Sequence, residues 1–178
     1  MKILTLLRHA KSDWDDPRQR DFDRPLNRRG RAAAHAIGRA MRDEGMIFDT
    51  IYASPAARVT ETLTLAGEGY GQPLAAEFDQ SLYLASPVLL LEKVQHAMEA
   101  GNSILLAGHN PGMEQLALML SGSGDPAALA ALAEKYPTGT LAAIRFDMDD
   151  WADVREGTGT LTRFLRPRDL DAALGPES

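Results

Sequence analysis

The chain has 178 residues, of which 44% are hydrophobic and 25% are charged, a composition typical of one soluble globular domain rather than two. Its formal net charge of −6 argues against a protein that binds nucleic acid without regard to sequence, since such proteins are normally basic. The absence of cysteine excludes disulfides, thiolate nucleophiles and cysteine zinc sites.

Nothing in the sequence points to a membrane. No run approaches the roughly 20 apolar residues of a membrane span. The apolar stretch 3–7 is too short for a signal peptide and has no small-residue cleavage site after it. We therefore expect a cytoplasmic protein that has no nucleic-acid or membrane partner and is a monomer or a weak dimer.

The first element that we predict is a strand over residues 3–7. An unbroken run of strand-compatible residues without turn signals is typical of a strand that is buried on both faces. Arg8 and His9 follow it directly. Ligand sites in open α/β sheets gather beyond the carboxyl ends of such strands, so this pair is a first candidate for a site. The charged loop 10–26 comes next, and we expect most of its side chains to be solvated.

Two helices are predicted from apolar residues at helical spacing. The first covers residues 28–44, with Asn27 as its N-cap, and the second covers residues 87–100. His35 and His96 lie on the water-facing sides of these helices, so we exclude both from the site. The second helix should bury one face, made of Leu90 or Leu91, Val94 and Met98.

Predicted strands alternate with helices along the rest of the chain. The strands are expected over residues 48–53, 72–78, 102–107, 138–148 and 159–166. A capping residue followed by proline, a favoured helix start, occurs at Ser54-Pro55, Ser86-Pro87, Asn110-Pro111 and Asp125-Pro126. Strands that lead into capped helices are typical of βα units. We therefore predict a single α/β domain over residues 1–178, with about six strands in a mostly parallel sheet.

Two segments are not predicted to belong to this alternation. Residues 121–137 combine a Ser-Gly-Ser-Gly stretch with an alanine-rich helix, which indicates a surface excursion. The tail from about residue 167 is rich in arginine, aspartate, proline and glycine, and we expect it to fray.

Three strand ends carry polar groups that a parallel sheet would bring to one edge. The first carries Arg8 and His9. The second leads to Arg58, in the first turn of a predicted helix, and the third carries His109 immediately before another helix. Ser12 cannot be far from His9, since only three residues separate them, and it is a further candidate for phosphate binding.

Two arginines and two histidines beside helix N-termini suit a dianionic phosphoryl group. Guanidinium groups bind phosphate oxygens in pairs, and helix N-termini supply backbone N–H donors. The sequence has no Gly-x4-Gly-Lys-Ser/Thr stretch, which excludes a P-loop nucleotide site. It also lacks the histidine, cysteine or carboxylate spacing of a metal site, so we predict a site with no metal and no cofactor.

The order of these motifs resembles that of the histidine phosphatase superfamily. The matching segments are Arg8-His9-Ala10, Ser54-Pro55-x-x-Arg58 with Thr60-Glu61-Thr62 behind it, and Gly108-His109-Asn110-Pro111. The segments Arg-His-Ala-Lys-Ser-x-Trp, Ser81-Leu82-Tyr83 and Gly-His-Asn-Pro-Gly resemble the short bacterial branch of SixA-type phosphohistidine phosphatases.

The resemblance implies a phosphoglycerate mutase-like fold. This is a three-layer α/β/α sandwich with one antiparallel strand, in which the first and fourth strands are neighbours. His9 would be the nucleophile and form a phosphohistidine enzyme that water then hydrolyses. Arg8, Arg58 and His109 would hold the transferred phosphoryl oxygens.

The substrate is predicted from the leaving group. Mutases and alkyl-phosphate phosphatases of this superfamily carry a glutamate after the third strand as general acid, and here only Asp79 could replace it. An imidazole, whose conjugate acid has a pKa of about 6.5, can leave without a strong acid. The favoured substrate is therefore protein phosphohistidine. The alternatives are a small phosphorylated molecule, a mutase reaction, or a catalytically silent phosphate-binding module.

Overall fold

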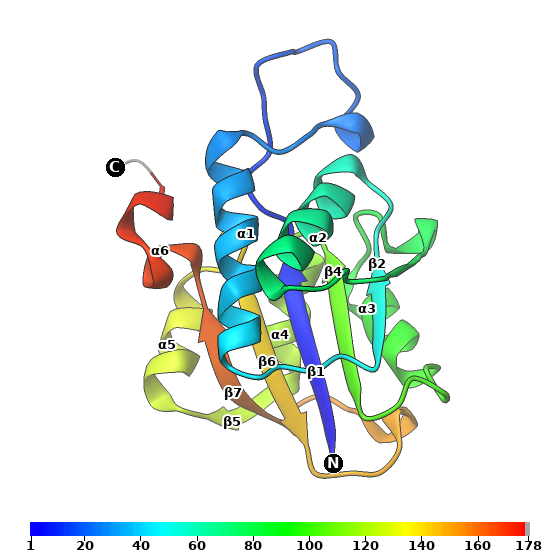
Figure 1. Ribbon diagram of the computed structural model, residues 1–178. Coiled ribbons are helices and arrows are strands. Elements are labelled where there is room, and N and C mark those ends of the chain that lie inside the picture. The colour runs from blue at the N-terminus through cyan, green and yellow to red at the C-terminus, as the bar shows by residue number, and fades with distance from the viewer. Residues whose placement is uncertain (177–178) are drawn as a thin grey trace.

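A seven-stranded sheet forms the middle layer of the molecule, and helices cover both of its faces (Figure 1). The computed structural model describes residues 1–176. No helix in this range is long and apolar enough to cross a bilayer. The helices and strands are β1 (Lys2–Arg8), α1 (Arg28–Asp43), β2 (Thr50–Ala53), α2 (Ala57–Tyr70), β3 (Glu77–Phe78), α3 (Pro87–Gln95), β4 (Ser103–Gly108), α4 (Gly112–Leu120), β5 (Ser121–Gly124), α5 (Pro126–Glu134), β6 (Leu141–Phe146), β7 (Gly159–Leu165) and α6 (Pro167–Leu170).

The strand order is β3-β2-β4-β1-β6-β7-β5. Among these strands only β6 is antiparallel to its neighbours, β1 and β7. The predicted mostly parallel sheet with one antiparallel strand is therefore confirmed, as is the adjacency of the first and fourth strands.

Successive residues of β1 pack on opposite faces of the sheet, as the pleat requires. Leu6 belongs to a buried cluster with residues of α3, α4 and α5, whereas Leu7 belongs to a second cluster with residues of α1 and α2. The two clusters make the molecule a three-layer α/β/α sandwich with β1 at its centre.

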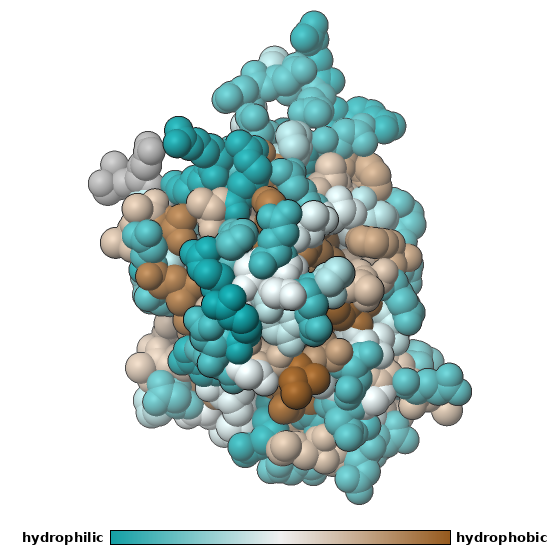
Figure 2. Space-filling model, viewed as in Figure 1, coloured by the Kyte–Doolittle hydropathy of each residue, from teal (hydrophilic) through white to brown (hydrophobic). Residues whose placement is uncertain are grey.

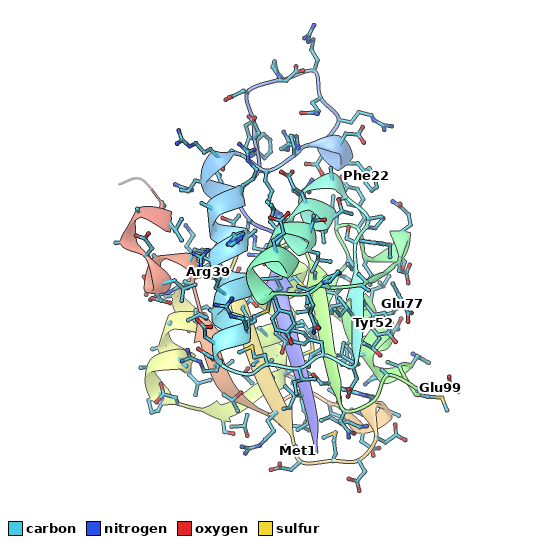
Figure 3. All side chains as sticks on the ribbon, in the orientation of Figure 1. Met1, Phe22, Arg39, Tyr52, Glu77 and Glu99 are labelled. Atoms are coloured by element: carbon cyan, nitrogen blue, oxygen red, sulfur yellow. The ribbon has the colours of Figure 1, made fainter. Side chains whose placement is uncertain are left out.

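The register of β1 and β4 determines where polar side chains meet. Arg8 pairs with Gly108 across the two strands, and the backbone N–H of His9 donates to the Gly108 carbonyl at 3.1 Å. His9 and His109 therefore leave neighbouring strands at the same level. Met1 lies at the opposite end of the sheet, and Phe22 lies beside the carboxyl edge (Figure 3). The charged loop 10–26 projects from the rest of the molecule and has a hydrophilic surface (Figure 2).

The sheet has one more strand than the six predicted. β5 lies within the segment predicted to be a surface excursion, and it pairs with β7 in parallel. Its Ser-Gly-Ser-Gly sequence has no apolar pattern, because an edge strand of small residues contributes little to the core. α5 is the expected alanine-rich helix, but its Leu132 is buried in the core. The third predicted strand, 72–78, is reduced to the two residues of β3.

Two of the four proline helix starts are confirmed and two are wrong. Ser86 and Asp125 cap α3 and α5 through side-chain oxygens that accept from Leu89 N and Ala128 N. Ser54 does not cap α2, which begins only at Ala57. Asn110 is not the N-cap of α4, where Pro111 takes that position. Ser54 and Asn110 closely follow the carboxyl ends of β2 and β4, and the chain turns there before the helix begins.

Two predictions about chain ends also need correction. α3 stops at Gln95, so Met98 is 83% exposed rather than buried on the helix face. The tail that we expected to fray from about residue 167 forms α6, followed by a short 3-10 turn over Ala172–Leu174. The last two residues of that prediction, 177 and 178, lie outside the described residues.

Helices α1 and α2 approach each other closely at glycines. A Cβ at Gly38 would lie 2.0 Å from the Ala66 carbonyl oxygen, and one at Gly69 would lie 2.1 Å from the His35 carbonyl oxygen. Because Arg58 lies at the start of α2, this contact also fixes the position of a predicted site residue.

We expect Gly38→Ala to lower the free energy of unfolding by about 1–3 kcal/mol, because the new methyl group forces the two helix backbones apart. This is the net loss, after the gain in helix propensity of roughly 1 kcal/mol from replacing glycine by alanine. Chemical denaturation measures it. Arg39→Ala, on the exposed side of α1, is the control and should change stability by less than about 0.5 kcal/mol. An unchanged or raised stability of Gly38→Ala would contradict the close contact.

Candidate active site

The His9 side chain is buried at the carboxyl end of β1, and both ring nitrogens have defined partners. Its Nδ1 lies 2.7 Å from the carbonyl oxygen of Ala10. Because a carbonyl can only accept, the proton of the neutral ring is on Nδ1 and the lone pair is on Nε2. Arg58 Nε donates to that Nε2 at 3.2 Å. The nitrogen next to Arg58 is therefore the one that carries the lone pair.

The pKa of His9 is lowered to about 3. Burial is the main cause, because it disfavours the charged ring, and the charges of Arg58, His109 and Arg8 act in the same direction. The hydrogen bond to Ala10 opposes them. His9 is thus a neutral imidazole throughout the physiological range.

Arg58 places a buried guanidinium group at the first turn of α2, where only 6% of its side chain is exposed. Its Nε contacts His9, while Nη1 donates to the backbone oxygen of Asp21 at 2.7 Å and Nη2 donates to the Asp21 carboxylate at 3.0 Å. The guanidinium group therefore joins the end of β1 to the charged loop 10–26.

Asp21 is the residue that sequence reasoning missed, because we expected its loop to be mostly solvated. Its carboxylate accepts hydrogen bonds from Arg58, from Arg24 at 2.9 Å and from the Tyr83 hydroxyl. Burial opposes ionisation of this carboxyl, but the three donors outweigh it and hold its pKa well below the usual range. The only hint in the sequence is Phe22, an apolar residue in a charged loop, whose ring packs edge-on against Tyr83.

His109 faces His9 from the end of β4, with ring centroids 5.3 Å apart. Its Nε2 lies 2.7 Å from the Ser54 hydroxyl. Burial lowers the pKa of His109 to about 4, the charges of Arg58 and Arg8 add to that effect, and Asp21 opposes it. The second imidazole is neutral as well. The Ser54 hydroxyl therefore orients His109 instead of capping α2.

Arg8 completes the group from the other face of β1. Its Nη1 donates to the Tyr136 carbonyl at 2.8 Å, and the side-chain amide of Asn110 donates to the same oxygen at 3.0 Å. Its charge contributes to the lowered pKa of both imidazoles. The structure thus brings His9, Arg58 and His109 into contact. It places Arg8 next to them at the end of β1, where its charge acts on both rings.

Known proteins resemble this chain in sequence and in fold. Residues 4–82 match the sequence profile of the histidine phosphatase superfamily (branch 1). A structure from Agrobacterium tumefaciens, provisionally named phosphohistidine phosphatase SixA, is 32% identical, covers 93% of this chain and 98% of its own, and gives a TM-score of 0.76. The chain belongs to the histidine phosphatase superfamily. The predicted phosphoglycerate mutase-like fold is confirmed.

Two further relatives extend this comparison. The uncharacterised protein Rv1276c of Mycobacterium tuberculosis is 35% identical over 164 residues, which cover 91% of this chain and all of that protein. A protein histidine phosphatase SixA, determined with tungstate, shares the fold at 20% identity, with a TM-score of 0.73 over 95% of this chain and 99% of its own.

Glu61 and Thr62, which follow Arg58 in α2, hold the charged loop 10–26 through hydrogen bonds. The Thr62 hydroxyl accepts from the backbone N–H of Ala10 at 3.0 Å and donates to the Arg58 carbonyl at 2.6 Å. Glu61 accepts from the backbone N–H of Leu26 at 2.9 Å. These two side chains attach both ends of the charged loop to α2.

Ser12 remains a prediction. It is buried and forms an isolated backbone bridge with Leu26, but none of the described residues makes a hydrogen bond with its hydroxyl. Over the described range, no three histidine, cysteine, aspartate or glutamate side chains gather closely enough to hold a metal ion.

The two lowered histidine pKa values predict that stability falls between pH 7 and pH 5. In the folded protein the pKa values are about 3 and about 4, and unfolding returns each ring to about 6.5. The unfolded chain therefore binds protons that the folded chain does not, and acidification favours unfolding. We expect a loss of about 2 kcal/mol for each imidazole over this interval, measured by urea denaturation at both pH values.

Between pH 7 and pH 5 the change in stability reports the imidazoles and not the carboxyl groups. Carboxyl groups with lowered folded pKa values, such as Asp21, cost stability only below about pH 5, where the unfolded chain starts to protonate them. His109→Gln should reduce the pH dependence by about half relative to the parent chain. Equal unfolding free energies of the parent chain at pH 7 and pH 5 would show that the rings are not held neutral.

Proposed function

We propose that the protein is a phosphatase that transfers a phosphoryl group from its substrate to His9 Nε2 and then to water, without a metal ion. The observation that supports it most is the state of His9. The ring is neutral, its Nδ1–H donates to the Ala10 carbonyl oxygen, and the lone pair of Nε2 lies beside Arg58. A neutral imidazole with a fixed tautomer is a competent nucleophile.

The first step forms a bond from Nε2 to phosphorus and breaks the bond from phosphorus to the leaving group. Phosphoryl transfer passes through a loose transition state, so positioning and charge stabilisation provide most of the catalysis. The Arg58 Nε–H donates to His9 Nε2 and would turn to a phosphoryl oxygen as that lone pair is used. Arg8 and His109 would bind the remaining oxygens. Water then attacks phosphorus, releases inorganic phosphate and restores His9.

The favoured substrate is a phosphohistidine on another protein, because the site offers no suitable general acid at Asp79. Hydrogen bonds from Ser81, followed by one from Lys93, lower the pKa of Asp79 to about 2, so this carboxyl has no proton to give at neutral pH. A phosphohistidine ring whose second nitrogen carries a proton leaves as neutral imidazole, whose conjugate acid has a pKa of about 6.5, so it tolerates that lack far better than an alkoxide does.

His9→Asn should abolish the covalent intermediate and lower turnover of p-nitrophenyl phosphate and of a phosphohistidine protein by at least about a thousandfold. Rapid quenching with radiolabelled phosphohistidine protein should trap an acid-labile, alkali-stable phosphoenzyme in the parent chain only. His96→Asn, the same change at an exposed histidine, is the control and should behave as the parent chain does.

EDTA should leave turnover of the parent chain unchanged. Strict dependence on an added metal, or a phosphoenzyme that persists in His9→Asn, would contradict the proposed mechanism.

Asp79→Asn should change kcat/KM by less than about threefold on the phosphohistidine protein and on p-nitrophenyl phosphate, because a carboxylate that is already ionised supplies no proton. Steady-state kinetics on both substrates, with an alkyl phosphate as the third, measures this. A variant that loses activity on alkyl phosphates alone would instead identify Asp79 as the general acid and favour a small-molecule substrate.

A further inference from the structure

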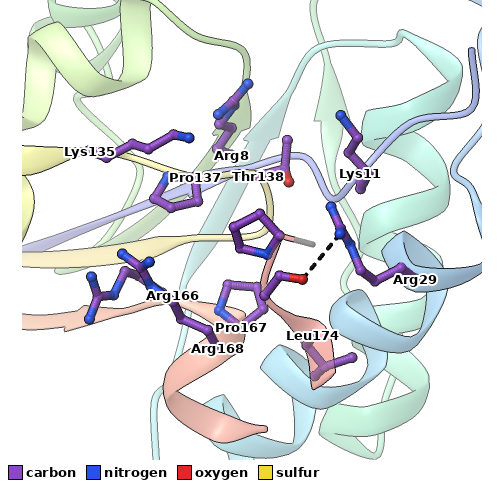
Figure 4. Close-up of a pocket in the computed structure, with 12 residues that line it drawn as sticks. Arg8, Lys11, Arg29, Lys135, Pro137, Thr138, Arg166, Pro167, Arg168 and Leu174 are labelled. Atoms are coloured by element: carbon purple, nitrogen blue, oxygen red, sulfur yellow. Dashed lines mark hydrogen bonds between the residues drawn. The ribbon is translucent and has the colours of Figure 1, made fainter. Parts of the chain in front are cut away.

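A small basic cavity lies beside the candidate active site, between the start of α1 and the C-terminal segment (Figure 4). Its volume is about 230 Å³. Six cationic side chains line it: Arg8, Lys11, Arg29, Lys135, Arg166 and Arg168. The other lining residues are uncharged, so no carboxylate from the described part of the chain faces it. We call this cavity the basic pocket.

Few of these cations are in ion pairs, although the charges of Glu114 and Asp169 act on Arg8 and Arg168 from outside the lining. Of the six cations only Arg166 has an ion-pair partner within the described range, Asp169 at 2.9 Å. The Nε atoms of Arg8 and Arg168 are buried, and no described residue offers them a hydrogen bond. Like charges around so small a cavity repel one another, and buried donors without partners are costly. An anion in the pocket would relieve the repulsion between the cations.

The walls of the basic pocket are held by specific contacts. Arg29 Nη1 donates to the Gly175 carbonyl at 3.1 Å, which fastens the C-terminal segment to α1 (Figure 4). Pro167 is buried against Gly139, whose positive φ of 74° suits glycine and where a Cβ would lie 2.9 Å from the proline ring. The Gly139 N–H donates to the His9 carbonyl at 2.9 Å. The turn that supports His9 therefore also supports the pocket.

Arg8 lies between the two sites. It lines the basic pocket, and its charge reaches both imidazoles of the active site. We propose that the basic pocket binds a second phosphate group, in addition to the phosphoryl group that reacts at His9. Its position relative to catalysis rests on the proposed function, whereas the binding itself does not.

A phosphate group fits this lining better than a carboxylate does. It carries up to two negative charges and three free acceptor oxygens, and guanidinium groups match its oxygens in bidentate pairs. A single carboxylate would leave most of the five unpaired cations without a partner. The second phosphate would be either part of the substrate molecule or free inorganic phosphate.

The test uses the double variant R29Q/R168Q and inorganic phosphate as the probe. Calorimetric titration at constant ionic strength should show two phosphates per parent chain and one per double variant. R39Q/R155Q is the matched control, because it removes the same charge from exposed positions, and it should keep both sites. One phosphate on the parent chain, or two on R29Q/R168Q, would overturn the proposal.

Kinetics separates this result from the proposed function. The double variant should hydrolyse p-nitrophenyl phosphate within about twofold of the parent chain, since that substrate has no second phosphate. A parent chain that binds two phosphates but shows no turnover would contradict the proposed function and leave the basic pocket supported. A parent chain that turns over substrate but binds one phosphate would support the proposed function and contradict the basic pocket as a phosphate site.

Inhibition by phosphate chains identifies the source of the second group. If both phosphates belong to one molecule, pyrophosphate or tripolyphosphate should compete with p-nitrophenyl phosphate at least about tenfold better than inorganic phosphate does, and R29Q/R168Q should lose that preference. Equal inhibition by all three, with two phosphates still bound to the parent chain, assigns the pocket to a separate phosphate ion.

Discussion

The parallel pairing of β1 with β4 is the constraint on which the site depends. Arg8 lies opposite Gly108, so the residues that follow them, His9 and His109, emerge side by side. A slip of one residue would turn each side chain of β1 to the other face of the sheet. A slip that moved Arg8 into the fully buried position of Leu7 would bury its charge in a core cluster, which is costly. The hydrophobic cores thereby fix the chemistry at the strand ends.

The charge balance of the site follows from burying a guanidinium group beside an imidazole. A buried cation is costly unless it is paired and hydrogen-bonded. Asp21 pairs Arg58, and Arg24 and Tyr83 satisfy the rest of that carboxylate. The same burial keeps both imidazoles uncharged. The result is a positively charged site in which neither imidazole adds a further cation.

The sequence predicted the parts of this arrangement that depend on apolar pattern and on strand ends. The strand before His9 is confirmed, and so is the adjacency of β1 and β4 that the family resemblance implied. The structure places His9 beside Arg58 and His109. Asp21 could not be predicted, because charged residues in a long loop look the same whether they are solvated or turned inward to an arginine. The edge strand β5 was missed for a related reason, since a strand of serine and glycine has no hydrophobic period.

The charge of the C-terminal segment is the reason why we expected it to fray, and the same charge lines the basic pocket. The segment is rich in arginine, aspartate, proline and glycine, so its composition favours a solvated tail. In the fold, Pro167 is buried and Gly175 is fastened by Arg29, although this order brings cations together around one cavity. Conflicts between local sequence preference and the fold tend to mark functional sites. An ordered segment that adds charge repulsion gains little for stability by itself, and it is best explained by an anion that the repelling groups share.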